Sequence, residues 1–270
     1  VSSGDLIQSF EATLTPSQLK SHWRSASLLR QFVFEAFRMI AKAVQAKKKP
    51  LSEIEVQQFL VSRFKAHGLT SDHAPIVAFG HHTSDPHYTP RHTASTRIRR
   101  GDLILIDIWA KEDRNDGVYA DITWMGYAGE TVPEKYAKVF KTVRQARDAA
   151  VRLVEHAASD GRKLCGWQVD DAARHVIAKA GHEAHFIHRT GHSIGTDVHG
   201  AGANMDNYET KESRRLVPGT LFSIEPGIYQ PSFGIRSEID VFFSEGKAYV
   251  TTTPSQSEIV PILKPGALHG

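Results

Sequence analysis

The chain has little of what marks three common classes of protein. Its 270 residues include one cysteine, Cys165, so no disulfide can form within the chain, and this fits a reducing compartment. No run is apolar for long enough to span a bilayer, and none reads as a secretory signal. Lysine plus arginine (33) barely exceeds aspartate plus glutamate (30), which is too little to indicate binding to nucleic acid or to a membrane surface. We therefore expect a cytoplasmic protein with neither kind of partner.

The composition is otherwise that of an ordinary globular protein. Hydrophobic residues make up 40% of the chain and charged residues 23%, and the length suffices for one large core. No low-complexity linker divides the sequence. We expect a single catalytic domain over residues 1–270, with residues 1–14 as a lead-in and no separate N-terminal domain. The fifteen histidines are a high number and raise the question of whether they cluster for chemistry.

The first half of the chain has the pattern of two helices followed by strands. Thr15 as N-cap and Pro16 at the first helical position open a long amphipathic run. A second helix is predicted after Ser52, which forms a capping box with Glu55, and it closes at Gly68. Three strand-like runs follow: "PIVAFG", "DLILIDIWA" and "GVYADITWMGYAG".

Near residue 129 the same order of elements starts again. Thr131 and Glu134 predict another capping box, and two helical segments follow. The strand-like pieces "AHFIHRTG", "TLFSIEPGIY", "GIRSEIDVFF" and "KAYVTTT" come next. There is no residue-level repeat, but the repeated order predicts an α+β fold. Its two helix-helix-sheet halves would share one core, with the functional site at the seam between them.

Four carboxylates interrupt these apolar strand patterns. Asp107 lies in "LILIDIW" and Asp121 in "VYADITW", and a hairpin of the two runs would turn both toward one point. Glu225 and Glu238 lie in equally apolar runs of the second half. Each residue alone is compatible with a hydrogen bond at a strand end. A buried carboxylate costs free energy unless a positive group meets it, so four together require an explanation.

A pair of metal ions would supply that positive charge. Four carboxylates carry four negative charges, which two divalent cations neutralise. His192 and His199, in the glycine-rich stretch "GHSIGTDVHG", offer imidazoles, although a loop histidine is often only a surface residue. Oxygen-rich donors with one imidazole suit Mn, Co, Fe or catalytic Zn. Two such ions about 3.5–4 Å apart can stabilise both sides of a hydrolytic displacement.

The order of these residues resembles the pita-bread metallopeptidases, which include methionine aminopeptidase, prolidase and aminopeptidase P. The resemblance lies in "LIDIWA", "ADITW", "GHSIGTDVHG", "SIEPGIY" and "GIRSEID" and covers residues 10–262. It implies a pita-bread fold with two divalent ions, manganese first and Co, Zn or Fe as alternatives. The implied ligands are Asp107, Asp121, His192, Glu225 and Glu238. It further implies that Glu225 is the general base, and that His87 of "DPHY" and His199 lie on the substrate side.

Three features depart from the family pattern, and a fourth divides its branches. Trp109 stands where the family usually has glycine, Trp124 stands where arginine is common, and the interval from Asp107 to Asp121 is about three residues longer than usual. The two tryptophans either reshape the pocket floor, with Trp109 contacting substrate, or pack beneath it. Arg236 resembles the substrate-binding arginine of the proline-specific branch, with a surface strand arginine as the alternative.

The resemblance implies a dinuclear-metal-dependent exopeptidase that removes N-terminal residues from peptides, with Xaa-Pro bonds expected. Three alternatives stay open: a methionine-aminopeptidase-like enzyme, a non-catalytic peptide- or protein-binding module on the same fold, and a metal-independent hydrolase of creatinase type. The expected partner is a peptide substrate. Whether the chain forms a homodimer is left open.

Overall fold

The computed structural model describes residues 3–46, 50–91, 93 and 95–268. Its first half opens with helices α1 (Ser3–Glu11), α2 (Pro16–Gln45) and α3 (Glu53–Ala66). The predicted caps are confirmed: the Gln18 backbone N–H donates to Thr15 Oγ1, and the Glu55 N–H donates to Ser52 Oγ. Gly68, at φ +67°, follows the end of α3 as predicted.

The sheet of the first half is built around one long hairpin. Strands β3 (Leu103–Glu112) and β4 (Ala120–Tyr127) pair antiparallel over eight positions. The short strands β1 (Leu69–Thr70) and β2 (Ile76–Phe79) pair with β3, and β11 (Val260–Pro261) pairs with β4. Because side chains alternate along a strand, one face of the hairpin packs on α2 and α3, and the other faces the second half.

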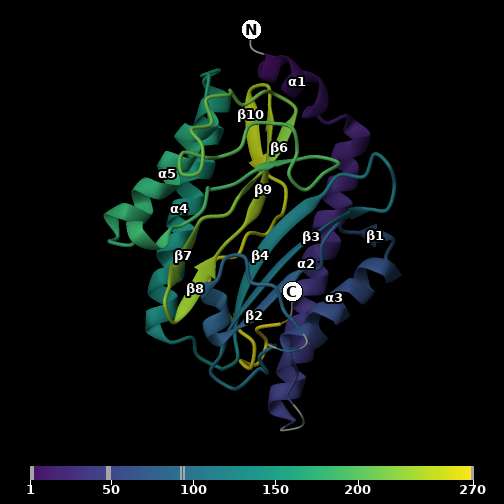
Figure 1. Ribbon diagram of the computed structural model, residues 1–270, viewed down its shortest axis with the longest axis vertical. Helices are drawn as coiled ribbons and strands as arrows, with labels where there is room; N and C mark the ends of the chain where they lie inside the picture. The colour runs from purple at the N-terminus through teal and green to yellow at the C-terminus, as the bar shows by residue number, and fades with distance from the viewer. Residues whose placement is uncertain (1–2, 47–49, 92, 94, 269–270) are drawn as a thin grey trace.

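The second half repeats this plan. Helices α4 (Glu134–Ser159) and α5 (Gly166–Lys179) lie on the opposite side of the strands from α2 and α3 (Figure 1). Its sheet has the order β10 (Lys247–Val250), β9 (Ile239–Ser244), β6 (Thr220–Ile224) and β5 (Ser193–Ile194). A separate hairpin joins β7 (Gly227–Gln230) to β8 (Phe233–Arg236). The strands therefore lie between two pairs of helices, as predicted for two α+β halves.

Three local predictions were wrong. Helix α4 begins after Pro133 without a side-chain cap, so the Thr131–Glu134 capping box does not form. Residues 184–191 are not a strand: a 3₁₀ turn, η2 (Glu183–His185), is followed by irregular backbone, in which the Thr190 N–H donates to the buried Asp170 carboxylate. The two glutamate-bearing runs are each broken into two strands, and each glutamate lies in the gap between them.

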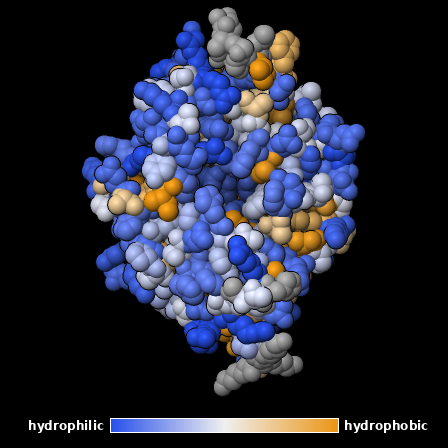
Figure 2. Space-filling model, viewed as in Figure 1, coloured by the Kyte–Doolittle hydropathy of each residue, from blue (hydrophilic) through white to orange (hydrophobic). Residues whose placement is uncertain are grey.

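Within the described part of the chain, no helix combines the length and the apolarity that crossing a membrane requires. Figure 2 shows a hollow near the middle of one face, with largely hydrophilic walls.

Candidate metal centre

The register of the β3–β4 hairpin brings the two aspartates onto one face. Asp107 pairs with Thr123, and Trp109 pairs with Asp121, so these four side chains form two adjacent rows on the face turned toward the second half. The side chains at the alternate positions of the hairpin point to its opposite face, toward α2 and α3. Trp124 is one of them: its ring meets Phe34 of α2 edge-on at 5.1 Å between centroids. Trp124 therefore packs beneath the sheet, whereas Trp109 lines the cavity above it.

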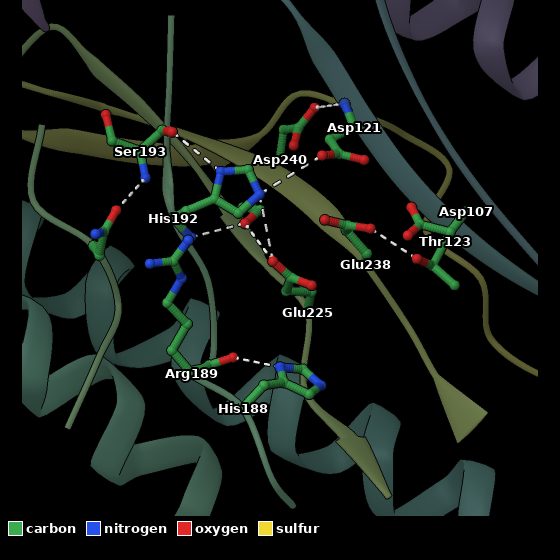
Figure 3. A network of polar contacts seen from close by, with 12 residues as sticks. Asp107, Asp121, Thr123, His188, Arg189, His192, Ser193, Glu225, Glu238 and Asp240 are labelled. Carbon is green, nitrogen blue, oxygen red and sulfur yellow. Dashed lines mark hydrogen bonds and ion pairs between the residues drawn. The ribbon is translucent and has the colours of Figure 1, made fainter. Parts of the chain in front are cut away.

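The second half brings its three predicted ligands to places where strands stop. His192 directly precedes β5, Glu225 follows β6 at the point where Pro226 interrupts the ladder, and Glu238 lies in the gap between β8 and β9. A strand end frees the side chain from the alternation that would point it into the core. All three side chains reach the aspartate rows of the hairpin (Figure 3). The Thr123 hydroxyl donates to Glu238 Oε2 at 2.7 Å, which links the two halves directly.

The tautomer of His192 follows from its contacts. Its Nδ1 lies 3.1 Å from the Ser193 carbonyl oxygen, which can only accept, so Nδ1 carries the proton. Nε2 is then unprotonated and has a free lone pair. It lies 3.4 Å from Glu225 Oε1 and 3.6 Å from Asp121 Oδ2. A lone pair directed at two carboxylate oxygens is repulsive unless a cation or a proton lies between them.

The donor set fits metal ions on two further observations. Donor atoms of Asp121, His192 and Glu238 lie within 4.8 Å of one another. Oδ1 of Asp107 and Oδ1 of Asp121 are buried and have no hydrogen-bond partner among the described residues. A buried carboxylate oxygen without a partner is costly, and coordination to a cation satisfies it. Hard oxygen donors with one imidazole suit a divalent first-row metal.

The pKa values of the site residues also indicate that the metal-free site lacks positive charge. Burial, and next the neighbouring carboxylates, raise the pKa values of Asp121 and Glu238 well above the usual range. Burial likewise raises the pKa of Glu225 to about 7, although Arg236 opposes the shift. Burial lowers the pKa of His192 to about 3, so its imidazole is neutral at physiological pH. Without metal, the site therefore holds protons that a cation would displace.

Arg236 supplies positive charge at one edge of the site. It is 3% exposed, which excludes the alternative of a surface arginine. One Nη donates to Asp107, and Nε donates to Thr123 Oγ1 at 3.1 Å. The other Nη donates to the Pro86 carbonyl and to the Tyr229 hydroxyl, each at 3.1 Å. The structure thus shows Arg236 holding Asp107 and the chain beside His87, while its predicted contact with substrate stays a prediction.

A cavity of about 590 Å³ opens above the carboxylates. Its two ends differ. Arg236, His87 and His188 lie at the Asp107 end, and Trp109, whose Nε1 donates to Asp72 at 3.0 Å, lies at the Asp121 end. The ring of His199 also lines the cavity, and its centroid is 4.5 Å from that of His192. All of the predicted site residues therefore border one cavity.

Sequence reasoning missed several residues of this cavity and its floor. Asp240 is fully buried beneath the site, and its Oδ2 accepts from the Asp121 N–H at 2.9 Å. His188 donates from Nδ1 to the Arg189 carbonyl, and its Nε2 accepts from the Tyr229 hydroxyl at 2.9 Å. Burial, followed by Arg236, lowers the pKa of His188 to about 3. Both residues had a detectable pattern: Asp240 lies two positions after Glu238, and His188 lies four before His192.

The fold and this donor set define a metallohydrolase of the pita-bread class. The chain belongs to metallopeptidase family M24, whose family model matches residues 24–245.

Relatives and solved structures agree with this assignment. The chain is 33% identical over 189 residues to the Xaa-Pro dipeptidase of Lactobacillus helveticus, covering 69% of this chain and 47% of that protein. The prolidase from Thermococcus sibiricus superposes with a TM-score of 0.74 at 28% identity, over 94% of this chain and 63% of that one. The X-Pro aminopeptidase from Thermotoga maritima gives 0.78 at 25% identity, over 94% and 66%. The chain thus spans about half to two thirds of the length of these relatives.

Proposed function

We propose that the chain is a dinuclear-metal-dependent exopeptidase that hydrolyses Xaa-Pro bonds. The observation that carries this proposal is that the unprotonated Nε2 of His192 faces Asp121 and Glu225, in a cavity that Asp107 and Glu238 also line. Asp107, Asp121, His192, Glu225 and Glu238 would hold two divalent ions. When bound, these ions would polarise the scissile carbonyl and make a water nucleophilic at neutral pH. The oxygen-rich donor set supports manganese, with Co, Zn and Fe as alternatives.

The side chains around the ions have distinct tasks in this proposal. Glu225 would take the proton of the attacking water and deliver it to the leaving amine. His87 and His199 would hold the scissile carbonyl as its oxygen becomes negative. Arg236 would hold Asp107 in place and line the Asp107 end of the cavity. Trp109 would form an apolar wall at the Asp121 end.

The relatives support Xaa-Pro bonds as the substrate class. A prolidase, an X-Pro aminopeptidase and an Xaa-Pro dipeptidase are all among the similar proteins. Proline in the second position makes the scissile bond a tertiary amide with no N–H and a fixed φ. The site must therefore recognise the carbonyl and the ring rather than an amide hydrogen, and the His87 imidazole and Arg236 at the Asp107 end offer donors to a carbonyl.

A peptide panel tests this assignment on metal-loaded protein of determined metal content. We expect Xaa-Pro peptides to be cleaved better than Met-Ala or Met-Gly peptides by at least about tenfold in kcat/KM, or 1.4 kcal/mol in transition-state binding. Preference for Met-Ala-Ser would indicate a methionine-aminopeptidase-like enzyme. No cleavage with two metals bound would favour a peptide-binding module, and turnover of non-peptide substrates without metal would favour a creatinase-type hydrolase.

The cellular location and assembly are also parts of the proposal. A cytoplasmic location is supported by the single cysteine, Cys165, and a peptide is the expected partner. Sedimentation would decide between a monomer and a homodimer.

A further inference from the structure

Glu53 is a buried carboxylate outside the metal centre, and the proposed chemistry does not use it. It lies at the first position of α3, is 0% exposed, and is not among the described residues that line the cavity. A charged side chain is rarely buried in this way unless donors satisfy it. The identity of those donors indicates what Glu53 does.

Among the described residues, the donors to the Glu53 carboxylate come from residues 79–96. The Phe79 N–H donates to Oε1 at 2.7 Å, and the Thr96 N–H donates to Oε2 at 2.7 Å, so both ends of the segment meet at one carboxylate. Between them, His82 Nδ1 lies 2.9 Å from Oε1, and the Tyr88 hydroxyl donates to Oε2 at 2.6 Å. The rings of His82 and Tyr88 stack at 4.4 Å between centroids. Hydrogen bonds to an ionised acceptor are the strong ones, so Glu53 holds the loop of residues 79–88 against the start of α3.

Two residues of this loop, Pro86 and His87, border the cavity, and His87 is the one with a side chain that can donate or accept a hydrogen bond there. Among the described residues, no hydrogen bond holds its imidazole, so its position depends on the backbone at either side. Before it, the Pro86 carbonyl accepts from Arg236 at 3.1 Å. After it, Tyr88 is tied to Glu53. His87 is therefore held between two anchors, one at the metal centre and one in α3.

We propose that Glu53 is a positioning residue that acts through Tyr88 to hold His87 over the reaction centre. The inference rests on the proposed function, in which His87 contacts the scissile carbonyl. A loss of the Tyr88 hydroxyl removes one anchor and leaves the other. The loop then gains freedom at His87, while the metal ligands, which lie on other elements, stay in place.

Tyr88→Phe is the principal variant, because it removes one hydroxyl and keeps the ring stacked on His82. Misplacement of a group that acts on the reacting atoms can cost on the order of a hundredfold, so we expect kcat/KM for Xaa-Pro peptides to fall about ten- to a hundredfold with metal content unchanged. In Glu53→Gln, kcat/KM should fall further, because the NH₂ group of the new amide would face N–H donors. Tyr249→Phe is the matched control: the Tyr249 hydroxyl makes no hydrogen bond in the described part of the chain, and its kinetics should match wild type.

A double-mutant cycle separates positioning from a general structural role. In a His87→Ala background, Tyr88→Phe should cost less than about twofold, because the residue that it positions is gone. An equal cost in both backgrounds, or wild-type kinetics for Tyr88→Phe, would overturn the inference.

An activity-independent measurement keeps this test distinct from that of the proposed function. The imidazole Cε1–H resonance of His87, assigned by its loss in His87→Ala, should shift or broaden in Tyr88→Phe and stay unchanged in Tyr249→Phe. An unchanged resonance in Tyr88→Phe would overturn the inference whatever peptides are cleaved. If wild type cleaves no Xaa-Pro peptide, the proposed function fails, and this resonance alone decides whether Glu53 and Tyr88 position His87.

Discussion

Glu225 has two proposed roles, metal ligand and general base, that one substitution can separate. Glu225→Gln keeps the shape and one carbonyl oxygen but removes the negative charge and the proton acceptor. We expect kcat to fall by a factor on the order of 10²–10⁴. Some metal should also be lost, because Glu225 Oε1 lies 3.4 Å from His192 Nε2 within the donor set. Steady-state kinetics on protein of measured metal content tests this prediction.

The metal measurement decides how a result is interpreted. A variant that keeps both metals and turns over near the wild-type rate would show that another residue is the base. A variant that loses both metals should recover little activity when metal is added in excess, because the base is also missing.

At individual positions, the sequence predicted the chemical role of a side chain better than its contacts in the fold. The carboxylates and His192 could be recognised because charges in apolar runs have few structural explanations. The burial of Arg236 could not, since its partners Asp107 and Pro86 lie some 130 to 150 positions earlier in the chain. Asp240 and His188 lie near predicted ligands in the sequence, but their contacts with the Asp121 N–H and the Tyr229 hydroxyl form only in the fold.

The segment that leads into His192 depends on a close approach of two backbones. A Cβ on Gly191 would lie 2.0 Å from the Ser223 carbonyl oxygen, so Gly191→Ala must push this segment away from β6. We expect a loss of about 1–3 kcal/mol in the free energy of unfolding, as for other overpacked sites, together with weaker metal binding. Denaturant titration and metal analysis measure the two effects.

Gly195 provides the control for this substitution. It lies only four residues away, just after β5, and an added Cβ there would meet no atom within 4 Å. Gly195→Ala should therefore keep both stability and metal affinity near wild type. If the two variants behaved alike, the close approach at Gly191 would not be what positions His192.

Helices were predicted more accurately than strands, and the difference has a physical cause. The caps at Thr15 and Ser52 are local devices, complete within four residues, so the sequence contains them whole. Pro226 marks the break after Glu225 in the sequence, whereas the apolar run around Glu238 gives no sign of its break. The strand predicted over 184–191 failed similarly, because the buried carboxylate of Asp170 takes the Thr190 N–H that a ladder would use.

Removal of the metals should weaken the entire fold. Metal that binds the folded state alone stabilises it by an amount that grows with the logarithm of its free concentration. We expect a chelator to abolish activity and to lower the melting temperature together. Full activity and an unchanged melting temperature after verified metal removal would refute the dinuclear site.

The metal-free protein should also respond to pH through Glu225. Its folded pKa, about 7, lies above its usual value of 4.5, so the folded state binds more protons than the unfolded state between these values. The associated stability is complete below pH 4.5 and is lost as the pH rises through 7. Metal-free Glu225→Gln lacks this titration. The melting temperature of this variant, relative to that of metal-free wild type, should therefore rise between pH 5 and pH 8. Parallel curves would exclude Glu225 as the titrating group.

The division of the donor set between the two halves makes metal affinity a gauge of their alignment. Asp107 and Asp121 belong to the β3–β4 hairpin, and the other ligands belong to the second half. Any change that shifts one half against the other should alter the dissociation constant of the metals. By thermodynamic reciprocity, metal binding stabilises the native arrangement of the two halves by the same coupling free energy. A packing change under α4, a helix that contributes no proposed ligand, would then be measurable as a change in metal affinity.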